Sequence, residues 1–188
     1  INSTDNIIIS TILGVYFVGL YSNYSMIVGV VTTFALMIFS ACSASLGNYN
    51  ASESGENVYF IFRVMTLLSI WVYGVASICF ACLFQPFIKL WIGEKYLLDT
   101  VTMSLVVIAF FLKGVISVSG TFIDITKLFI RTRMVPILMA IINIVVSIVA
   151  AKIIGLAGIF LGTIVSYCIT QLWINPFILC KYRFGVSF

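Results

Sequence analysis

Histidine is absent from the 188-residue chain, and charged side chains make up only 9% of it. The lack of histidine removes the commonest metal ligand and the side chain that most often shuttles protons near neutral pH. The net charge of +4 is modest and forms no clustered basic face of the kind that nucleic acid requires. We therefore expect no metal site, no cofactor and no nucleic-acid partner.

Long polar segments are also missing, because no predominantly polar stretch exceeds about a dozen residues, which leaves no room for a separate soluble catalytic domain. The sequence contains no phosphate-binding glycine-rich loop and no Ser/His/Asp set. The five cysteines all lie in apolar segments, and the CxxC formed by Cys79 and Cys82 has no second pair. We interpret the cysteines as packing residues and predict that the protein is not an enzyme.

Hydrophobic residues, in contrast, make up 62% of the chain, which is typical of a membrane protein. A spanning helix needs roughly 20 mainly apolar residues. Because period-two alternation is missing, helices and not a barrel are expected. The fold class predicted is an all-α polytopic membrane bundle of about six transmembrane helices, the first one truncated. The five complete candidates are Phe17 to Leu46, Val58 to Phe84, Leu98 to Phe122, Val135 to Ile154 and Leu156 to Tyr182.

Glycine, proline and short polar segments mark the expected ends of these helices. Residues 1 to 13 form the partial helix, which Gly14 closes. The segment "GNYNASESGEN" is expected to be a solvated loop, and Pro86 is expected to stop or kink the third helix. The first residues already have a helical pattern without an initiator Met, so we expect the chain to be a piece of a longer polypeptide.

Positive charge is distributed unequally between the two ends of the predicted helices. One side holds Arg63, Lys127, Arg131, Arg133, Lys181 and Arg183, whereas the other holds Lys89, Lys95 and Lys152. Because cytoplasmic loops carry an excess of Lys and Arg, the C-terminus is predicted to be cytoplasmic.

Ionisable residues inside predicted helices are costly and indicate function, and the candidates are Asp5, Lys113 and Arg63. Asp5 lies near mid-membrane if its helix continues before Ile1, and Asn2, Asn6 and Ser10 would then share its polar stripe; otherwise Asp5 is an ordinary N-terminal residue. Lys113 is too deep to reach the interface easily, so it should line water or protein. Arg63, one turn from a helix end, could reach the interface or bind a ligand.

Small residues indicate where helices pack closely. They are Gly158, Gly162 and Ser166 in the last helix and Ala140, Asn143, Ser147 and Ala151 in the helix before it. Asn143 is either an interhelical contact or a cavity donor to a polar ligand. Tyr16, Tyr21 and Tyr24 are expected to form an interfacial aromatic belt.

Several segments resemble, in order and spacing, the C-terminal half of Wzx-type oligosaccharide flippases, which are polysaccharide transporters of the MATE-related multidrug/oligosaccharidyl-lipid/polysaccharide superfamily. They are "TDNIIIS", "VGLYSNYSMIV", "SLGN", "PFIKLWIGEKYLL" and "IINIVVSIVAAKIIGLAGIFLGTIVS". The resemblance implies a MATE-like fold of two six-helix bundles around a cavity that opens alternately to each side. Residues 1–188 would form the C-terminal bundle, and the N-terminal bundle would belong to the same polypeptide.

The resemblance also implies a substrate, an undecaprenyl-pyrophosphate-linked oligosaccharide flipped across the bacterial inner membrane for capsule, O-antigen or exopolysaccharide synthesis. On burial arguments alone, Lys113 and Arg63 are the candidate anion contacts, Asn143 and Asn6 the candidate sugar contacts, and Asp5 the candidate ion-coupling residue. The alternatives are a cation-coupled drug exporter of the same superfamily, which would need more buried acid, and a membrane-embedded glycan-processing enzyme, which would need a larger polar loop.

Overall fold

The computed structural model describes residues 3–52 and 54–185, and regular structure in these residues is entirely helical. The first half of the described chain contains α1 (Ser3–Ile12), α2 (Val15–Ser52), α3 (Gly55–Trp91) and a 3₁₀ turn, η1 (Glu94–Tyr96). The second half contains α4 (Thr100–Ile125), α5 (Phe129–Thr132), α6 (Met134–Ile154), α7 (Leu156–Ile169), α8 (Gln171–Leu179) and a π-helical turn, η2 (Cys180–Phe184).

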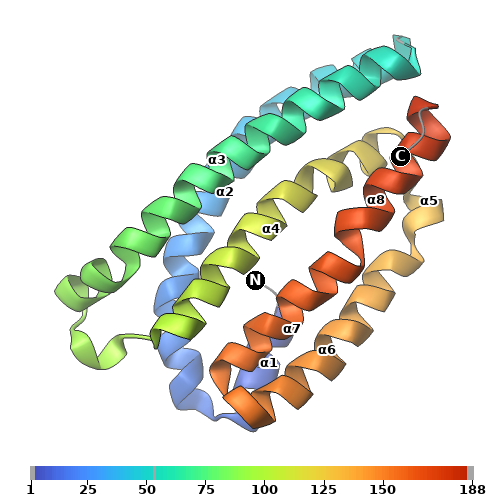
Figure 1. The fold of residues 1–188 in the computed structure, drawn as a ribbon. Coiled ribbons are helices and arrows are strands. Elements are labelled where there is room, and N and C mark those ends of the chain that lie inside the picture. Colours follow the sequence, from blue (N-terminus) through green and yellow to red (C-terminus); the bar gives the residue numbers. More distant parts are fainter. Residues whose placement is uncertain (1–2, 53, 186–188) are drawn as a thin grey trace.

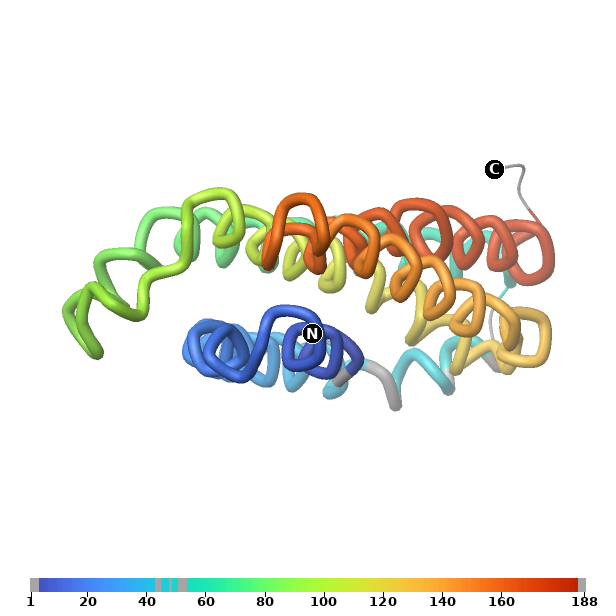
Figure 2. Tube along the Cα trace, turned by 90° about the horizontal axis from the view of Figure 1, so that it is seen from below, coloured from blue at the N-terminus to red at the C-terminus, as the bar shows by residue number. Residues whose placement is uncertain are grey.

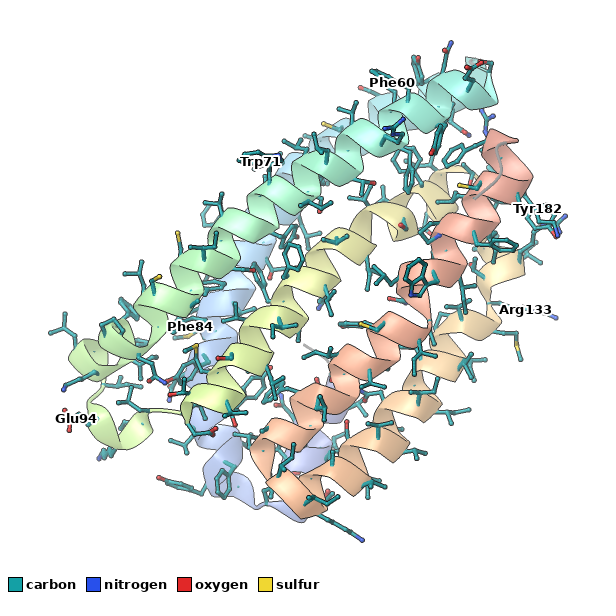
Figure 3. The ribbon with its side chains drawn as sticks, in the orientation of Figure 1. Phe60, Trp71, Phe84, Glu94, Arg133 and Tyr182 are labelled. Carbon is teal, nitrogen blue, oxygen red and sulfur yellow. The ribbon has the colours of Figure 1, made fainter. Side chains whose placement is uncertain are left out.

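Within the described residues, five helical segments are long and apolar enough to cross a membrane. Many of their large apolar side chains are exposed, and Figure 3 shows Phe60 and Trp71 pointing away from the bundle. The predicted helical membrane bundle is therefore confirmed, as is the end of α1 beside Gly14, whose φ of 96° ends the helix. The segments are Val15–Cys42, Gly55–Trp91, Thr100–Ile125, Phe129–Ile154 and Leu156–Phe184.

The helices form two layers (Figures 1 and 2). In the first layer α3, α4, the continuous α7–α8 segment and α6 lie side by side, whereas α2 lies behind α3 and α4, and α1 lies behind α7. This arrangement brings α1 and α2, from the start of the chain, against helices that are distant in sequence. The face between the layers is where the candidate site lies.

Helices α6 and α7 are in the close contact that their small residues predict. A Cβ atom on Gly162 would lie 2.7 Å from the backbone nitrogen of Ser147, so no side chain fits there. The Ser147 hydroxyl donates to the carbonyl of Ile159 at 3.1 Å across the same contact. Ala140, however, is exposed and lies outside the contact. The prediction for Ala140 is wrong because its side chain is exposed, whereas Asn143, Ser147 and Ala151 are buried.

The tyrosines of α2 do not form the expected aromatic belt. Tyr21 and Tyr24 are 0% exposed, and only Tyr16 is exposed. The Tyr24 hydroxyl accepts the backbone N–H of Leu98 at 3.1 Å and lies 3.3 Å from Gln85 Oε1, to which it donates. The three-residue spacing places Tyr21 and Tyr24 on the face of α2 that packs inside the bundle, so tertiary contacts override their interfacial preference.

Most of the segment expected to be a solvated loop is helical. Helix α2 continues to Ser52 and α3 begins at Gly55. Arg183 extends from the other end of the chain, where Nε donates to Asn50 Oδ1 and Nη2 to the Asn50 carbonyl, both at 2.7 Å. These bonds give a polar partner to the last turn of α2, whose carbonyls would otherwise lack one within the helix.

Pro86 does not end α3 either, because this helix continues to Trp91. A proline removes one backbone donor, but neighbouring polar groups often compensate for such breaks in membrane helices. Next to Pro86, the Gln85 amide donates to the carbonyl of Leu98 at 2.7 Å. The Gln85 side chain thereby holds the end of α3 against the chain that enters α4.

Candidate binding cavity between the two layers

A cavity of about 410 Å³ lies between α1, α2, α4 and α7. Its walls combine apolar side chains, such as Phe110 and Phe160, with an unusual number of polar groups for the interior of a membrane bundle. The polar lining residues are Asp5 and Asn6 on α1, Ser25, Thr32 and Thr33 on α2, Lys113 on α4, and Thr163 and Tyr167 on α7. The cavity is therefore amphipathic, with both charge signs present.

Lys113 lies in the middle of α4, about 18 Å from either end of this helix at about 1.5 Å per residue. Its side chain is exposed and lines the cavity. Among the described residues, Lys113 forms no ion pair; the salt bridge found there joins Lys89 and Glu94. The sequence predicts that Lys113 lines water or protein, and the structure places it at the wall of this cavity.

The α4 backbone beside Lys113 is fixed by tight contact with α3. Gly114 packs directly on the ring of Tyr73, where a Cβ atom would overlap the aromatic carbons. The Ser69 hydroxyl donates to the carbonyl of Gly114 at 3.0 Å. Because Gly114 is held in this way, the position from which Lys113 enters the cavity is well defined.

Asp5 is almost completely buried, with 1% of its surface exposed, so the predicted burial is confirmed. The hydroxyl of Thr163 on α7 lies 3.3 Å from Asp5 Oδ1 and can donate to it. The Thr163 hydroxyl oxygen in turn accepts the side-chain amide of Asn143 on α6 at 2.9 Å. This chain of bonds connects α1, α7 and α6 at one wall of the cavity, but the predicted coupling role of Asp5 stays a prediction.

The structure brings Asp5, Asn6 and Lys113 to one cavity, as three of the five residues singled out in the sequence. Asn143 is buried and donates a hydrogen bond to Thr163 on the next helix, as the hypothesis of an interhelical contact predicts. Arg63 lies at a separate cavity between α3 and α8, with its guanidinium carbon 5.9 Å from the centre of the Tyr59 ring. Of the two remaining members of the predicted polar stripe, Ser10 is exposed and does not line this cavity, and Asn2 lies outside the described residues.

Sequence reasoning missed the polar face of α2. Ser25, Gly29, Thr32 and Thr33 are spaced at about one helical turn, which is the signal that could have revealed this face. Each hydroxyl donates to a carbonyl of its own helix, as Thr32 does to Val28 at 2.7 Å and Thr33 to Gly29 at 2.9 Å. Their oxygen lone pairs therefore remain available to accept hydrogen bonds from a ligand.

The arrangement suits a ligand that carries both negative charge and hydroxyl groups. The Lys113 ammonium can bind an anion, while the hydroxyls of α2 and the amide of Asn6 can accept or donate hydrogen bonds to a polyhydroxylated group. Comparisons with protein-family models, curated proteins and solved structures find no match to this chain.

Replacing Thr163 with valine should destabilise the protein by about 1–3 kcal/mol, because the buried Asn143 amide would lose its acceptor without a change in side-chain volume. Thermal unfolding of the purified protein measures this effect. Thr163→Ser keeps the hydroxyl and should stay close to wild type. Equal stability of the valine and serine variants would show that the hydrogen bond between α6 and α7 contributes nothing.

Proposed function

We propose that this protein is a transporter that flips undecaprenyl-pyrophosphate-linked oligosaccharide across the bacterial inner membrane by alternating access, in the synthesis of capsule, O-antigen or exopolysaccharide. The observation that carries the proposal is the cavity between the layers, where a lysine at mid-helix lies among hydroxyl and amide groups. It agrees with the sequence resemblance to Wzx-type flippases.

The physical requirement for flipping a lipid-linked sugar is to keep its polar part away from hydrocarbon. A pyrophosphate needs positive charge, which Lys113 supplies, and sugar hydroxyls need hydrogen-bond partners, which Asn6 and Thr33 supply. Asp5, buried beside Thr163, is our candidate for a coupling cation or proton. Arg63 lies at its own cavity nearer one end of the bundle, where it could contact the anion before entry or after exit.

In this proposal, residues 1–188 are the C-terminal bundle of a MATE-like, two-bundle transporter. Lys113 and Asn6 are both exposed, so the cavity is accessible from outside this bundle. A second bundle of the same polypeptide would cover that opening and complete the translocation path.

The C-terminus is proposed to be cytoplasmic, because Lys and Arg are concentrated at the end of the bundle that holds α5 and η2. Single cysteines introduced at Lys95 and Arg131, which are both exposed, test this orientation in a cysteine-free protein. An impermeant thiol reagent added to intact cells should label position 95 and spare position 131. Labelling at 131 alone would reverse the proposed orientation.

A drug exporter is the second candidate, because the cavity also contains a buried carboxylate, Asp5, beside apolar side chains such as Phe110. Deletion of the gene separates the two functions. Loss of a flippase should abolish surface glycan and leave lipid-linked oligosaccharide in the cytoplasmic leaflet, with unchanged resistance to cationic drugs. Normal glycan with lowered drug resistance would favour the exporter and contradict the proposal.

A further inference from the structure

A second polar cavity, of about 290 Å³, lies at the end of the bundle that contains α5. It is formed by α4, α5, α6 and α8 and is separate from the cavity that lies between the layers. Its polar lining includes Asp124, Arg133, Gln171 and Asn175. Neither the proposed translocation path nor the resemblance uses these residues.

Asn175 contributes a polar atom without a hydrogen-bond partner to this cavity. Its side chain lines the cavity from the middle of α8, and only 6% of its surface is exposed. Its carbonyl oxygen, Oδ1, is buried without a hydrogen-bond partner among residues 3–52 and 54–185. A buried acceptor without a partner costs stability, so a hydrogen bond from a ligand hydroxyl or amine that reaches this atom would be favourable.

The opposite wall of the cavity is suited to an anion. Arg133, which is exposed, lies at the N-terminal cap of the 21-residue helix α6, and no side-chain cap hydrogen bond is formed there. The cavity is also lined by Val135 and Pro136 from the first turn of α6. In the described chain, Asp124 is the one acidic residue that lines this cavity, and it is exposed. Positive charge exceeds negative charge in this part of the sequence, because Lys127 and Arg131 lie between Asp124 and Arg133.

The position of the cavity indicates a lipid as the source of the anion. Asp124 and Phe129 lie at the ends of segments able to cross the membrane, which is the level of the phospholipid headgroups, and Arg133 lies about one helical turn inside the second segment. Figure 3 shows Arg133 and Tyr182 on the outside of the bundle at this end. The guanidinium carbon of Arg131 lies 3.9 Å from the centre of the Tyr182 ring, and Phe129 is exposed, so the surroundings combine positive charge with apolar surface.

We propose that this cavity binds the headgroup of an anionic glycerophospholipid with free headgroup hydroxyls, of the phosphatidylglycerol type. The phosphodiester lies against Arg133 and the first turn of α6, and a glycerol hydroxyl donates to Asn175 Oδ1. The acyl chains run along the exposed apolar face beside Phe129. The proposal rests on the membrane location of the helices and is independent of the substrate in the central cavity.

Lipid binding to the purified full-length protein, measured by native mass spectrometry, tests this site with three lipids of matched acyl chains. Phosphatidylglycerol should bind more tightly than phosphatidylmethanol, which has the same charge without headgroup hydroxyls, and both should bind more tightly than phosphatidylcholine. Arg133→Gln should weaken phosphatidylglycerol binding by about fivefold or more. Lys152→Gln, the same change in charge at the opposite end of α6, should leave binding unchanged.

Asn175→Leu provides a second, independent readout, because it removes the acceptor while keeping the side-chain volume similar. It should bring phosphatidylglycerol binding down to the level of phosphatidylmethanol without weakening the latter. Preserved preference for phosphatidylglycerol in this variant would overturn the proposal. Equal binding of phosphatidylcholine, or displacement of the lipid by millimolar glycerol 3-phosphate, would also overturn it, since the second result would identify a soluble ligand.

Discussion

Lys113→Gln should lower glycan export by about tenfold or more while leaving the amount of folded protein in the membrane normal. The reason is that the Lys113 ammonium lines the cavity without an ion pair among the described residues, so glutamine removes a ligand contact and no structural partner. Lys113→Arg keeps the positive charge and should retain export. The measurement is surface glycan in cells that carry each variant of the full-length protein, normalised to its level in the membrane.

The matched control for this substitution is Lys152→Gln. Lys152 is exposed near the end of α6 and does not line the cavity between the layers, so its loss changes the net charge equally without touching the proposed path. Export should stay at the wild-type level. Full export by normally expressed Lys113→Gln would remove this residue from the substrate path, and a large loss of folded protein would show a structural role instead.

Gly162→Ala should destabilise the protein by about 1–3 kcal/mol, and Gly162→Leu should lower the yield of folded protein further. Even a methyl group at this position would lie 2.7 Å from the backbone nitrogen of Ser147, so α6 and α7 would have to separate. Their separation would also disturb the hydrogen bond between Asn143 and Thr163. The melting temperature of the detergent-solubilised protein reports the effect.

Gly74→Ala is the matched control, because a Cβ atom there would meet only Phe111 Cε2, at an ordinary contact distance of 3.9 Å. Since alanine favours a helix more than glycine, Gly74→Ala should be neutral or slightly stabilising. A Gly162→Ala protein that melts at the wild-type temperature would contradict the close contact between α6 and α7.

The features predicted correctly from the sequence depend on local patterns. The five spanning segments follow from the length of their apolar runs, and the end of α1 follows from Gly14. The contact of α7 with α6 follows from Gly158 and Gly162, because four-residue spacing places small residues on one helix face. The place of Lys113 in the middle of α4 also follows from counting residues along a helix.

The features that were missed depend on which helices meet. The burial of Tyr21 and Tyr24 is decided by the face of α2 that packs against other helices, which hydropathy does not reveal. The helical end of α2 is held by Arg183, which is 133 residues away from Asn50 in the sequence. The separate position of Arg63 likewise follows from the arrangement of α3 and α8 in space.

The polar side chains of α2 in the candidate site also could not be predicted without knowing which helices meet. Thr32 and Thr33 bond to their own helix, so within a single helix they resemble threonines that are tolerated in lipid. They become cavity residues only because α2 lies opposite α4, where Lys113 is placed. The two charged residues of the site, Asp5 and Lys113, could therefore be found in the sequence, whereas its neutral hydroxyl groups required the fold.

The most direct test of the proposed function is flipping by the purified full-length protein in lipid vesicles. Undecaprenyl-pyrophosphate oligosaccharide is supplied in the outer leaflet, and the fraction that becomes protected from an external glycosidase is followed in time. Our account predicts protection that requires the protein, is retained with Lys113→Arg and is lost with Lys113→Gln. Protection at the rate of protein-free vesicles under every imposed ion gradient, or equal rates for the two variants, would contradict it.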